Sequence, residues 1–179
     1  GYNVLLFEGP GQTGKRRFHP DSSFVPDCAP ALRAVVDFAL ARPEVHPAKI
    51  ALYGASFGGY FALSGAVGEP RLGAVIANSP LIDAQEHFFA GMGPHFVSMF
   101  QNQDLTAEEI RAMPEEELPA KYKFSLLSLC VRYGKPSVKE TLDVMRDFRL
   151  REDQLRSLNI PALGLVSEAE GTVPLAQAK

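Results

Sequence analysis

The stretch Ile50–Tyr60 limits the possible folds of this chain more than any other feature. It holds a Gly-x-Ser-x-Gly pattern from Gly54 to Gly58, placed between an apolar run and a small, apolar helical segment. A serine in this context is expected on a sharp turn from a buried strand into a helix, which lifts its hydroxyl out of the sheet. Both glycines of the pattern would leave room around the turn. The pattern therefore predicts an α/β fold in which Ser56 is the nucleophile.

The residue after the serine is the candidate oxyanion-hole donor. The backbone N–H of Phe57 would begin the helix, where unpaired N–H groups and the helix dipole favour a developing negative charge. A serine hydroxyl is a weak nucleophile and also needs a general base. The alternative interpretation, which the pattern leaves open, is a glycine-rich turn that only packs a helix against a strand.

Apolar runs and helical patterns alternate on both sides of this motif. The first helical segments are expected between strands, at 30–42 and 57–67, and that order predicts a mostly parallel sheet with right-handed crossovers. Residues 81–158 show helical patterns only, including one at 119–133 that Gly134 would end. We expect an α/β core of residues 1–80 and 159–179, incomplete at both ends, with a helical cap at 81–158 inserted after the strand at 72–77. The expected strands are 2–7, 49–53, 72–77 and 160–166.

Three separate segments resemble the α/β-hydrolase superfamily. They are Glu8–Gln12 after the first strand, the serine motif itself, and residues 160–166 leading to an acidic loop. The first is similar to a loop of the subgroup that holds 2,6-dihydropseudooxynicotine hydrolase, the fermentation-respiration switch protein and fungal polyketide-shortening hydrolases. The resemblance implies a helical cap over the pocket and hydrolysis of an ester or of a carbon–carbon bond beside a ketone. Thr13 departs from the family, which usually has glycine there.

The resemblance implies an acid after the strand that follows the cap. Glu170 is the preferred candidate, although aspartate is commoner at that place in the family. Glu168 is a second possibility and Asp83, shortly after the third expected strand, is a third. The chain order in this fold is serine, acid, histidine.

The histidines do not fit that order. His19 and His46 precede the serine, and His87 and His95 lie at the start of the expected cap. We therefore expect the base to lie beyond Lys179. These 179 residues by themselves are expected to be inactive for lack of the catalytic histidine.

Aromatic side chains near the start of the expected cap are candidates for substrate contact. Phe88 and Phe96 would line an apolar pocket over Ser56, as is common in ligand sites. The alternative is that they form the core of the cap itself. The first interpretation predicts a small, apolar substrate.

Charge and cysteine content exclude several other classes of function. The net charge of -3 argues against binding of nucleic acid, which needs a clustered positive face. Cys28 and Cys130 are too few for a disulfide framework and are expected as free thiols in the cytoplasm. No run is long enough to span a membrane, and no ligand spacing indicates a metal or a cofactor. A homodimer is a possible state.

The sequence thus predicts a serine hydrolase that acts on an ester, thioester or ketone-activated C–C bond through an acyl-enzyme on Ser56. Two alternatives remain open. One is a serine peptidase of the prolyl-oligopeptidase kind, although the helical insertion is unusual for that type. The other is a non-catalytic binding protein built on the same fold.

Overall fold

A three-stranded parallel sheet forms the centre of the computed structural model, which describes residues 1–170, 176 and 177. The strand order is β1-β2-β3. Ala51 pairs with Ala74, and Val75 pairs with Ala162. Each strand begins slightly later in the sequence than the apolar run that predicted it. In β1 the reason is that Pro47–Lys49 forms a 3₁₀ turn before the strand. The predicted α/β class with a parallel sheet is confirmed. The strands are β1 (Ala51–Ala55), β2 (Ala74–Asn78) and β3 (Ala162–Leu165).

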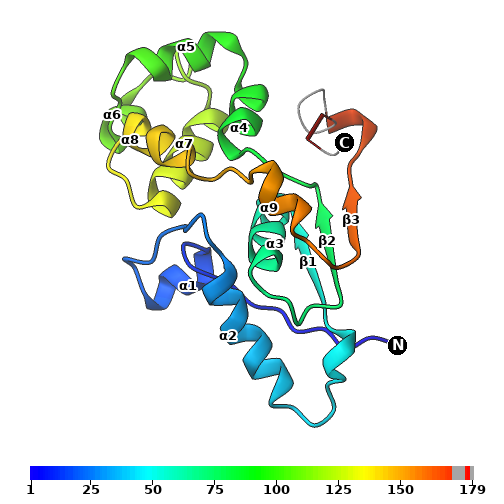
Figure 1. Cartoon of the computed structure of the whole chain (residues 1–179). Coiled ribbons are helices and arrows are strands. Elements are labelled where there is room, and N and C mark those ends of the chain that lie inside the picture. The colour runs from blue at the N-terminus through cyan, green and yellow to red at the C-terminus, as the bar shows by residue number, and fades with distance from the viewer. Residues whose placement is uncertain (171–175, 178–179) are drawn as a thin grey trace.

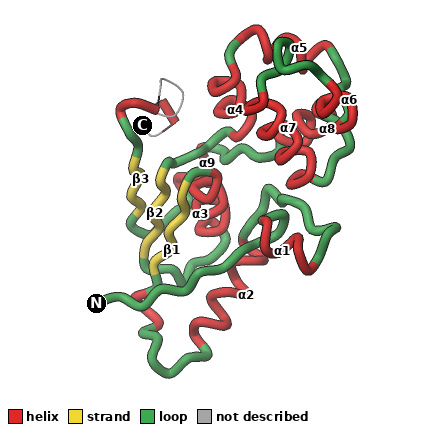
Figure 2. Tube along the Cα trace, turned by 180° about the vertical axis from the view of Figure 1, so that it is seen from behind, coloured by secondary structure: helices red, strands yellow, loops and turns green. Residues whose placement is uncertain are grey.

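The first expected strand, at residues 2–7, is wrong. This run is extended, but it pairs with no strand among the described residues, and Tyr2 and Leu6 are 99% and 90% exposed. An extended segment becomes a strand only when its backbone groups pair with a neighbour. Within the described residues β1 pairs with β2 alone, so its other edge is open. Figure 2 draws this run as a loop. A cavity of about 240 Å³ is lined by Leu5–Phe7 and by residues 52–55 of β1.

Two helices cover one side of the sheet. Helix α3 (Phe57–Val67) packs against β1 and β2 and has the predicted bounds. Helix α2 (Ala29–Leu40) packs on α3 through an apolar face that includes Leu32 and Val36. A short helix, α1 (Thr13–Phe18), lies between the Glu8–Gln12 segment and α2. Because α3 packs against both the sheet and α2, its small apolar residues are largely buried.

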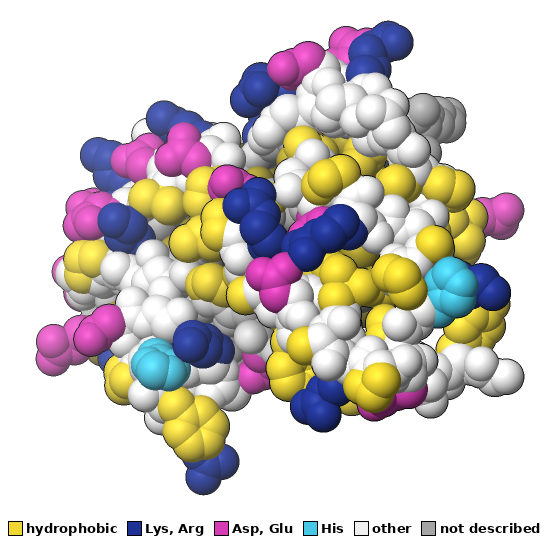
Figure 3. Space-filling view, turned by 60° about the horizontal axis from the view of Figure 1, so that its bottom comes forward, with side chains coloured by type: hydrophobic (Ala, Val, Ile, Leu, Met, Phe, Trp, Pro, Cys, Tyr) yellow, Lys and Arg dark blue, Asp and Glu magenta, His cyan; other side chains and the backbone are white. Residues whose placement is uncertain are grey.

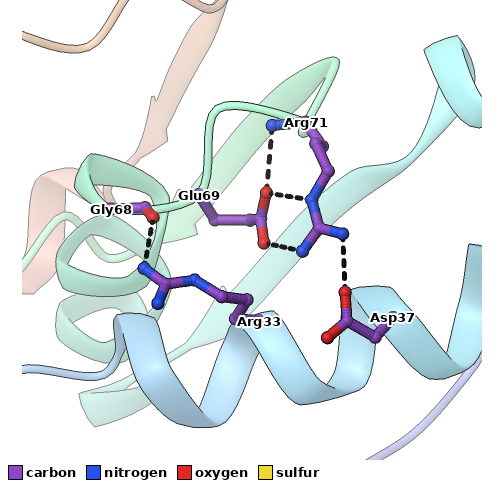
Figure 4. A network of polar contacts seen from close by, with 5 residues as sticks. All are labelled: Arg33, Asp37, Gly68, Glu69 and Arg71. Carbon is purple, nitrogen blue, oxygen red and sulfur yellow. Dashed lines mark hydrogen bonds and ion pairs between the residues drawn. The ribbon is translucent and has the colours of Figure 1, made fainter.

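An ion-pair network joins these two helices to the turn before β2 (Figure 4). The carboxylate of Glu69 is 1% exposed and accepts hydrogen bonds from the Nε and Nη2 atoms of Arg71 at 2.8 and 2.5 Å. The same guanidinium reaches Asp37 on α2 at 2.6 Å. Arg33, also on α2, donates to the carbonyl oxygen of Gly68 at 3.3 Å. The end of α3 is therefore fixed to α2 by charge as well as by apolar packing.

Residues 84–145 form a separate group of helices beyond the carboxyl ends of the strands (Figure 1). We call α4–α8 the helical group. Its interior holds Phe100, Ile110 and Leu126, and Thr106 and Glu109 form a capping box at the start of α6. Gly134 ends α7 as predicted. The helices are α4 (Ala84–Met92), α5 (Pro94–Asn102), α6 (Ala107–Ala112), α7 (Ala120–Tyr133) and α8 (Val138–Met145), and the chain returns through α9 (Glu152–Arg156).

The chain enters and leaves the helical group along one narrow connection. The N–H of Leu150 donates to the carbonyl oxygen of Ile82 at 2.9 Å, and the N–H of Ala84 donates to that of Phe148 at 3.0 Å. Asp83 and Arg149 lie between these two bonds and form an ion pair of 3.6 Å. The two crossings are therefore held side by side.

Charges of both signs are mixed on the surface. On the face drawn in Figure 3, Lys and Arg side chains are interspersed with Asp and Glu. Throughout the described part of the chain, no helix combines the length and the apolar character needed to cross a bilayer.

Candidate active site

Ser56 occupies the turn between β1 and α3, as the motif predicts. Its backbone has φ 53° and ψ -127°, a positive φ that residues other than glycine adopt only rarely and at a cost in energy. Its N–H donates to the carbonyl oxygen of Asn78 at 2.5 Å, which ties the turn to the end of β2. Its own carbonyl oxygen accepts from the N–H of Gly59 at 2.8 Å. The residue is exposed, so the strand–turn–helix geometry of the prediction is confirmed.

Close packing around the turn explains one glycine of the motif but not the other. A Cβ at Gly54 would lie 1.9 Å from the carbonyl oxygen of Gly58. A Cβ at Gly58 would meet no atom within 4 Å, so the expected crowding there is wrong. The crowded position is the next one, because a Cβ at Gly59 would lie 1.9 Å from the carbonyl oxygen of Ser79. Gly54 and Gly59 are therefore the residues that allow the turn to pack against both strands.

Two groups at the turn are available to a reacting molecule. The hydroxyl of Ser56 makes no capping hydrogen bond to α3, and no partner for it is found in residues 1–170, 176 and 177. The same holds for the backbone N–H of Phe57, the first residue of the helix. A nucleophile and a hydrogen-bond donor thus stand next to each other at the positive end of α3. This is the arrangement that an acyl-transfer site requires.

Known proteins with similar sequences and structures indicate which family this chain resembles. No family model matches the chain. It is 30% identical over 173 residues to "Hydrolase ORFZ" of Pyricularia oryzae, across 91% of this chain and 40% of that protein. It is 26% identical over 162 residues to "Alpha/beta hydrolase ucsC" of Acremonium sp, across 86% of this chain and 32% of that protein. The crystal structure of the 2,6-dihydroxy-pseudo-oxynicotine hydrolase matches with a TM-score of 0.54 and 22% identity, covering 87% of this chain and 34% of that one.

The chain has the α/β-hydrolase fold and resembles proteins that are named hydrolases. The alignment with the first relative covers most of this chain, and the solved structure has the same fold. The chain spans less than half the length of the curated relatives it matches. The fold follows from these matches, and the activity is taken up below as a proposal.

The acid candidates of this chain occupy different settings. Glu170 ends a 3₁₀ turn, Glu168–Glu170, that follows β3, so its backbone lies where the acid was expected. The orientation of its side chain lies outside the described part of the structure. Glu168, in the same turn, is exposed. Asp83 already accepts a hydrogen bond from the N–H of Glu86 at 2.9 Å as the N-cap of α4 and pairs with Arg149.

The histidines of this chain lie away from the position expected for a base. His95 is exposed on α5 and packs its ring against that of Phe96, with centroids 5.2 Å apart. His46 caps the 3₁₀ turn before β1 by accepting from the N–H of Ala48. His87 lies on α4 and is half-buried. No histidine follows β3 in the sequence.

Phe88 and Phe96 pack within the helical group. Phe96 contacts the rings of Phe100 and Tyr122, at centroid distances of 6.4 and 4.5 Å. Phe88 contacts Phe89 at 6.1 Å and lies against residues of α7 and α8. No described cavity brings either residue together with Ser56. These contacts favour the alternative that both belong to the core of the helical group, and their contact with substrate stays a prediction.

The cavity at the open edge of β1 adjoins the serine turn. It is lined by Ala55 and Gly58, which lie on either side of Ser56. Residues of the Gly9–Gln12 loop, which is similar to a loop of the α/β-hydrolases, also line it. Ser56 itself is not among the lining residues. The cavity therefore lies behind the turn and does not enclose the nucleophile.

The thiols are poor nucleophiles in this structure. Cys28 and Cys130 are both free and buried. Burial raises the pKa of Cys28 to about 12 and also raises the pKa of Cys130. Both therefore stay protonated near neutral pH, where the thiol is unreactive. Within the described residues, no three His, Cys, Asp or Glu side chains are grouped so that they could hold a metal ion.

Sequence analysis missed an aromatic cluster directly behind the nucleophile. The ring of Phe57 stacks on that of Phe24 at 5.3 Å and lies 6.4 Å from Tyr133 and 6.3 Å from Phe148. Tyr133 ends α7 and Phe148 lies in the segment that follows α8, so two of these three partners come from that part of the chain. The contacts join residues far apart in the chain, and no local pattern could have indicated them. We call Phe24, Phe57, Tyr60, Phe61, Tyr133 and Phe148 the aromatic cluster.

Proposed function

We propose that the protein is a serine hydrolase that forms an acyl-enzyme on Ser56. The observation that carries the proposal is the strained, exposed position of Ser56 between β1 and α3. A backbone with positive φ at a residue that is not glycine is costly, and such strain is typical of functional sites. The neighbouring N–H of Phe57, which has no partner in the described residues, adds the second element of the site.

The reaction follows from these two groups and a base. The Ser56 oxygen attacks the carbonyl carbon of the substrate, and its proton passes to the general base. The negative charge moves to the carbonyl oxygen, where the Phe57 N–H donates a hydrogen bond. The bond to the leaving group then breaks, the base returns the proton to that group, and the acyl-enzyme remains. Water, deprotonated by the same base, attacks the acyl-enzyme and releases the acid.

The resemblance to α/β-hydrolases suggests the other two members of the proposed triad, the acid and the base. Glu170 would orient the base, since its backbone follows β3. The base itself would be a histidine, which takes the proton of the serine in such triads. The helical group would act as a cap over the site, because it lies beyond the carboxyl ends of the strands, where ligands of α/β sheets bind.

The proposed substrates are small, apolar esters or thioesters, or compounds with a C–C bond beside a ketone. The helical group is apolar and aromatic, with the partly buried Phe96 and Tyr122 and the buried Met92 on its helices. A cap of this composition would exclude water and favour apolar acyl groups over charged ones.

The direct test is turnover of p-nitrophenyl esters by the full-length natural protein. Release of p-nitrophenol from acetyl and butyryl esters is expected, with loss of turnover in Ser56→Ala and unchanged folding by circular dichroism. A folded Ser56→Ala protein that retains the wild-type rate would refute the role of Ser56. Folded wild-type protein that turns over none of these esters, and none of a set of 1,3-diketones, would favour a non-catalytic binding protein.

A further inference from the structure

We propose that Tyr133, at the end of α7, and Phe148, in the segment after α8, position the Phe57 N–H for the oxyanion. The inference rests on the proposed function, because it gives both residues a part in the same reaction. Phe57 has two roles, one through its backbone and one through its side chain. Its backbone N–H has no partner among the described residues, while its side chain lies in the aromatic cluster. Whatever holds the ring therefore also fixes the start of α3.

The ring of Phe57 is held from both layers of the molecule. Phe24 stacks on it from the loop before α2, at a centroid distance of 5.3 Å and an interplanar angle of 13°. Tyr133 approaches it from the end of α7 at 6.4 Å and Phe148 from the segment after α8 at 6.3 Å, and these two rings meet edge to face at 4.8 Å. Such geometries are the favourable ones for aromatic pairs.

Backbone hydrogen bonds hold both partners in place. The carbonyl oxygen of Arg132, next to Tyr133, accepts a bond of 2.8 Å from the N–H of Phe24. The carbonyl oxygen of Phe148 accepts one of 3.0 Å from Ala84. The end of α7 and the exit from the helical group are thus fixed where they contact the cluster. A change in the position of the end of α7 or of the segment after α8 would then move the ring of Phe57, because the rings are in direct contact.

The ring of Tyr133, rather than its hydroxyl, would do the positioning. Tyr133 is 2% exposed, and its hydroxyl oxygen has no hydrogen-bond partner in the described structure. Burying such a group without a partner is unfavourable, so the hydroxyl does not account for the placement of the residue. Protein interiors are close-packed, and the loss of one ring lets its neighbours shift. A shift of the Phe57 N–H matters because a displacement of 1 Å at a site can cost about a hundredfold in rate.

The experiment measures inactivation of the full-length natural protein by a small alkyl fluorophosphonate. Binding (KI) and chemistry (kinact) are separated by varying the concentration of the probe. Tyr133→Leu is expected to lower kinact about tenfold with KI unchanged, because the donor acts on the developing charge and not on the bound probe. Tyr133→Phe keeps the ring and is expected to stay within about twofold of wild type in kinact.

Phe100→Leu is the matched control. It also removes a buried ring from the helical group, but Phe100 packs on Phe96 and has no ring contact with Phe57 among the described residues. It is expected to lower the melting temperature as Tyr133→Leu does and to leave kinact unchanged. Equal losses of kinact in the two leucine variants, or no loss in Tyr133→Leu, would overturn the inference.

A second measurement separates this inference from the proposed function. The amide resonance of Phe57 in ¹H–¹⁵N spectra is expected to shift in Tyr133→Leu and not in Phe100→Leu. Absence of labelling at Ser56 in folded wild-type protein would refute the proposed function, and the amide resonance would still decide whether Tyr133 positions Phe57. An unmoved Phe57 resonance in folded Tyr133→Leu would refute the positioning role even if labelling is normal.

Discussion

The carbonyl oxygen of Gly58 occupies the space in which a side chain at Gly54 would stand. A Cβ at residue 54 would lie 1.9 Å from that oxygen and 2.9 Å from the Cβ of Ala62. Neither atom can move without shifting the first turn of α3. The close approach of strand and helix that presents Ser56 therefore depends on the absence of a side chain at residue 54.

Gly54→Ala is expected to destabilise the protein and to abolish its reaction with fluorophosphonates. The added methyl group must push α3 away from β1, at a cost of about 1–3 kcal/mol. Gly91→Ala on α4 is the control, because a Cβ there meets no atom within 4 Å. That variant is expected to be at least as stable as wild type. Thermal melts and labelling of both variants check the prediction, and full labelling of Gly54→Ala would contradict it.

Gly58→Ala and Gly59→Ala are expected to change stability in opposite directions. A methyl group at residue 58 meets open space, and alanine in a helix is favoured over glycine by about 0.5–1 kcal/mol. A methyl group at residue 59 would lie 1.9 Å from the carbonyl oxygen of Ser79 and must separate α3 from the end of β2. Urea denaturation of the two variants measures the difference. A Gly59→Ala protein as stable as Gly58→Ala would show that the packing described here is wrong.

Glu170→Gln is expected to lower ester turnover by about four orders of magnitude, as the loss of the orienting acid does in a serine triad. Asp83→Asn is the comparison among the acid candidates. Asparagine can still cap α4, so this variant is expected to lose only the ion pair with Arg149 and to keep near wild-type turnover. Steady-state kinetics of both variants check the assignment. The reverse pattern would make Asp83 the acid.

The Glu69–Arg71 pair predicts a specific loss of stability in acid. Hydrogen bonds from Arg71 are the main cause that lowers the pKa of Glu69 in the folded protein. The unfolded chain has a glutamate pKa of about 4.3 and binds a proton first as the pH falls. The pair therefore stabilises the folded state fully above that pH, and the contribution is lost as the pH falls through the folded pKa.

Glu69→Gln isolates this effect. The wild type is expected to be more stable than the variant at pH 7, with a difference that shrinks below about pH 4.3 and then disappears. Urea denaturation of both proteins between pH 7 and pH 3 measures it. A difference that is constant over this range would mean that the carboxylate charge contributes nothing.

The local features of the site could be predicted from the sequence because a few adjacent residues determine them. The turn at Ser56 and the bounds of α3 follow from the glycine pattern and the apolar runs beside it. The end of α7 at Gly134 follows from the same kind of local signal. These elements need no knowledge of distant parts of the chain.

Features that depend on distant partners could not be predicted. The run at residues 2–7 has strand composition but pairs with no described strand, and composition alone cannot supply a neighbour. The contacts of Phe57 with Tyr133 and Phe148 connect residues more than 70 positions apart. The roles of Gly58 and Gly59 depend on which atoms approach them, and only the packing of α3 on β2 shows that.

The most direct test of the nucleophile is the site of labelling by a fluorophosphonate in the full-length natural protein. Peptide mass spectrometry after labelling is expected to find the probe on Ser56 and on no other serine, with no labelling after heat denaturation. Labelling of a different serine, or none in protein shown to be folded, would contradict the assignment of Ser56 as the nucleophile.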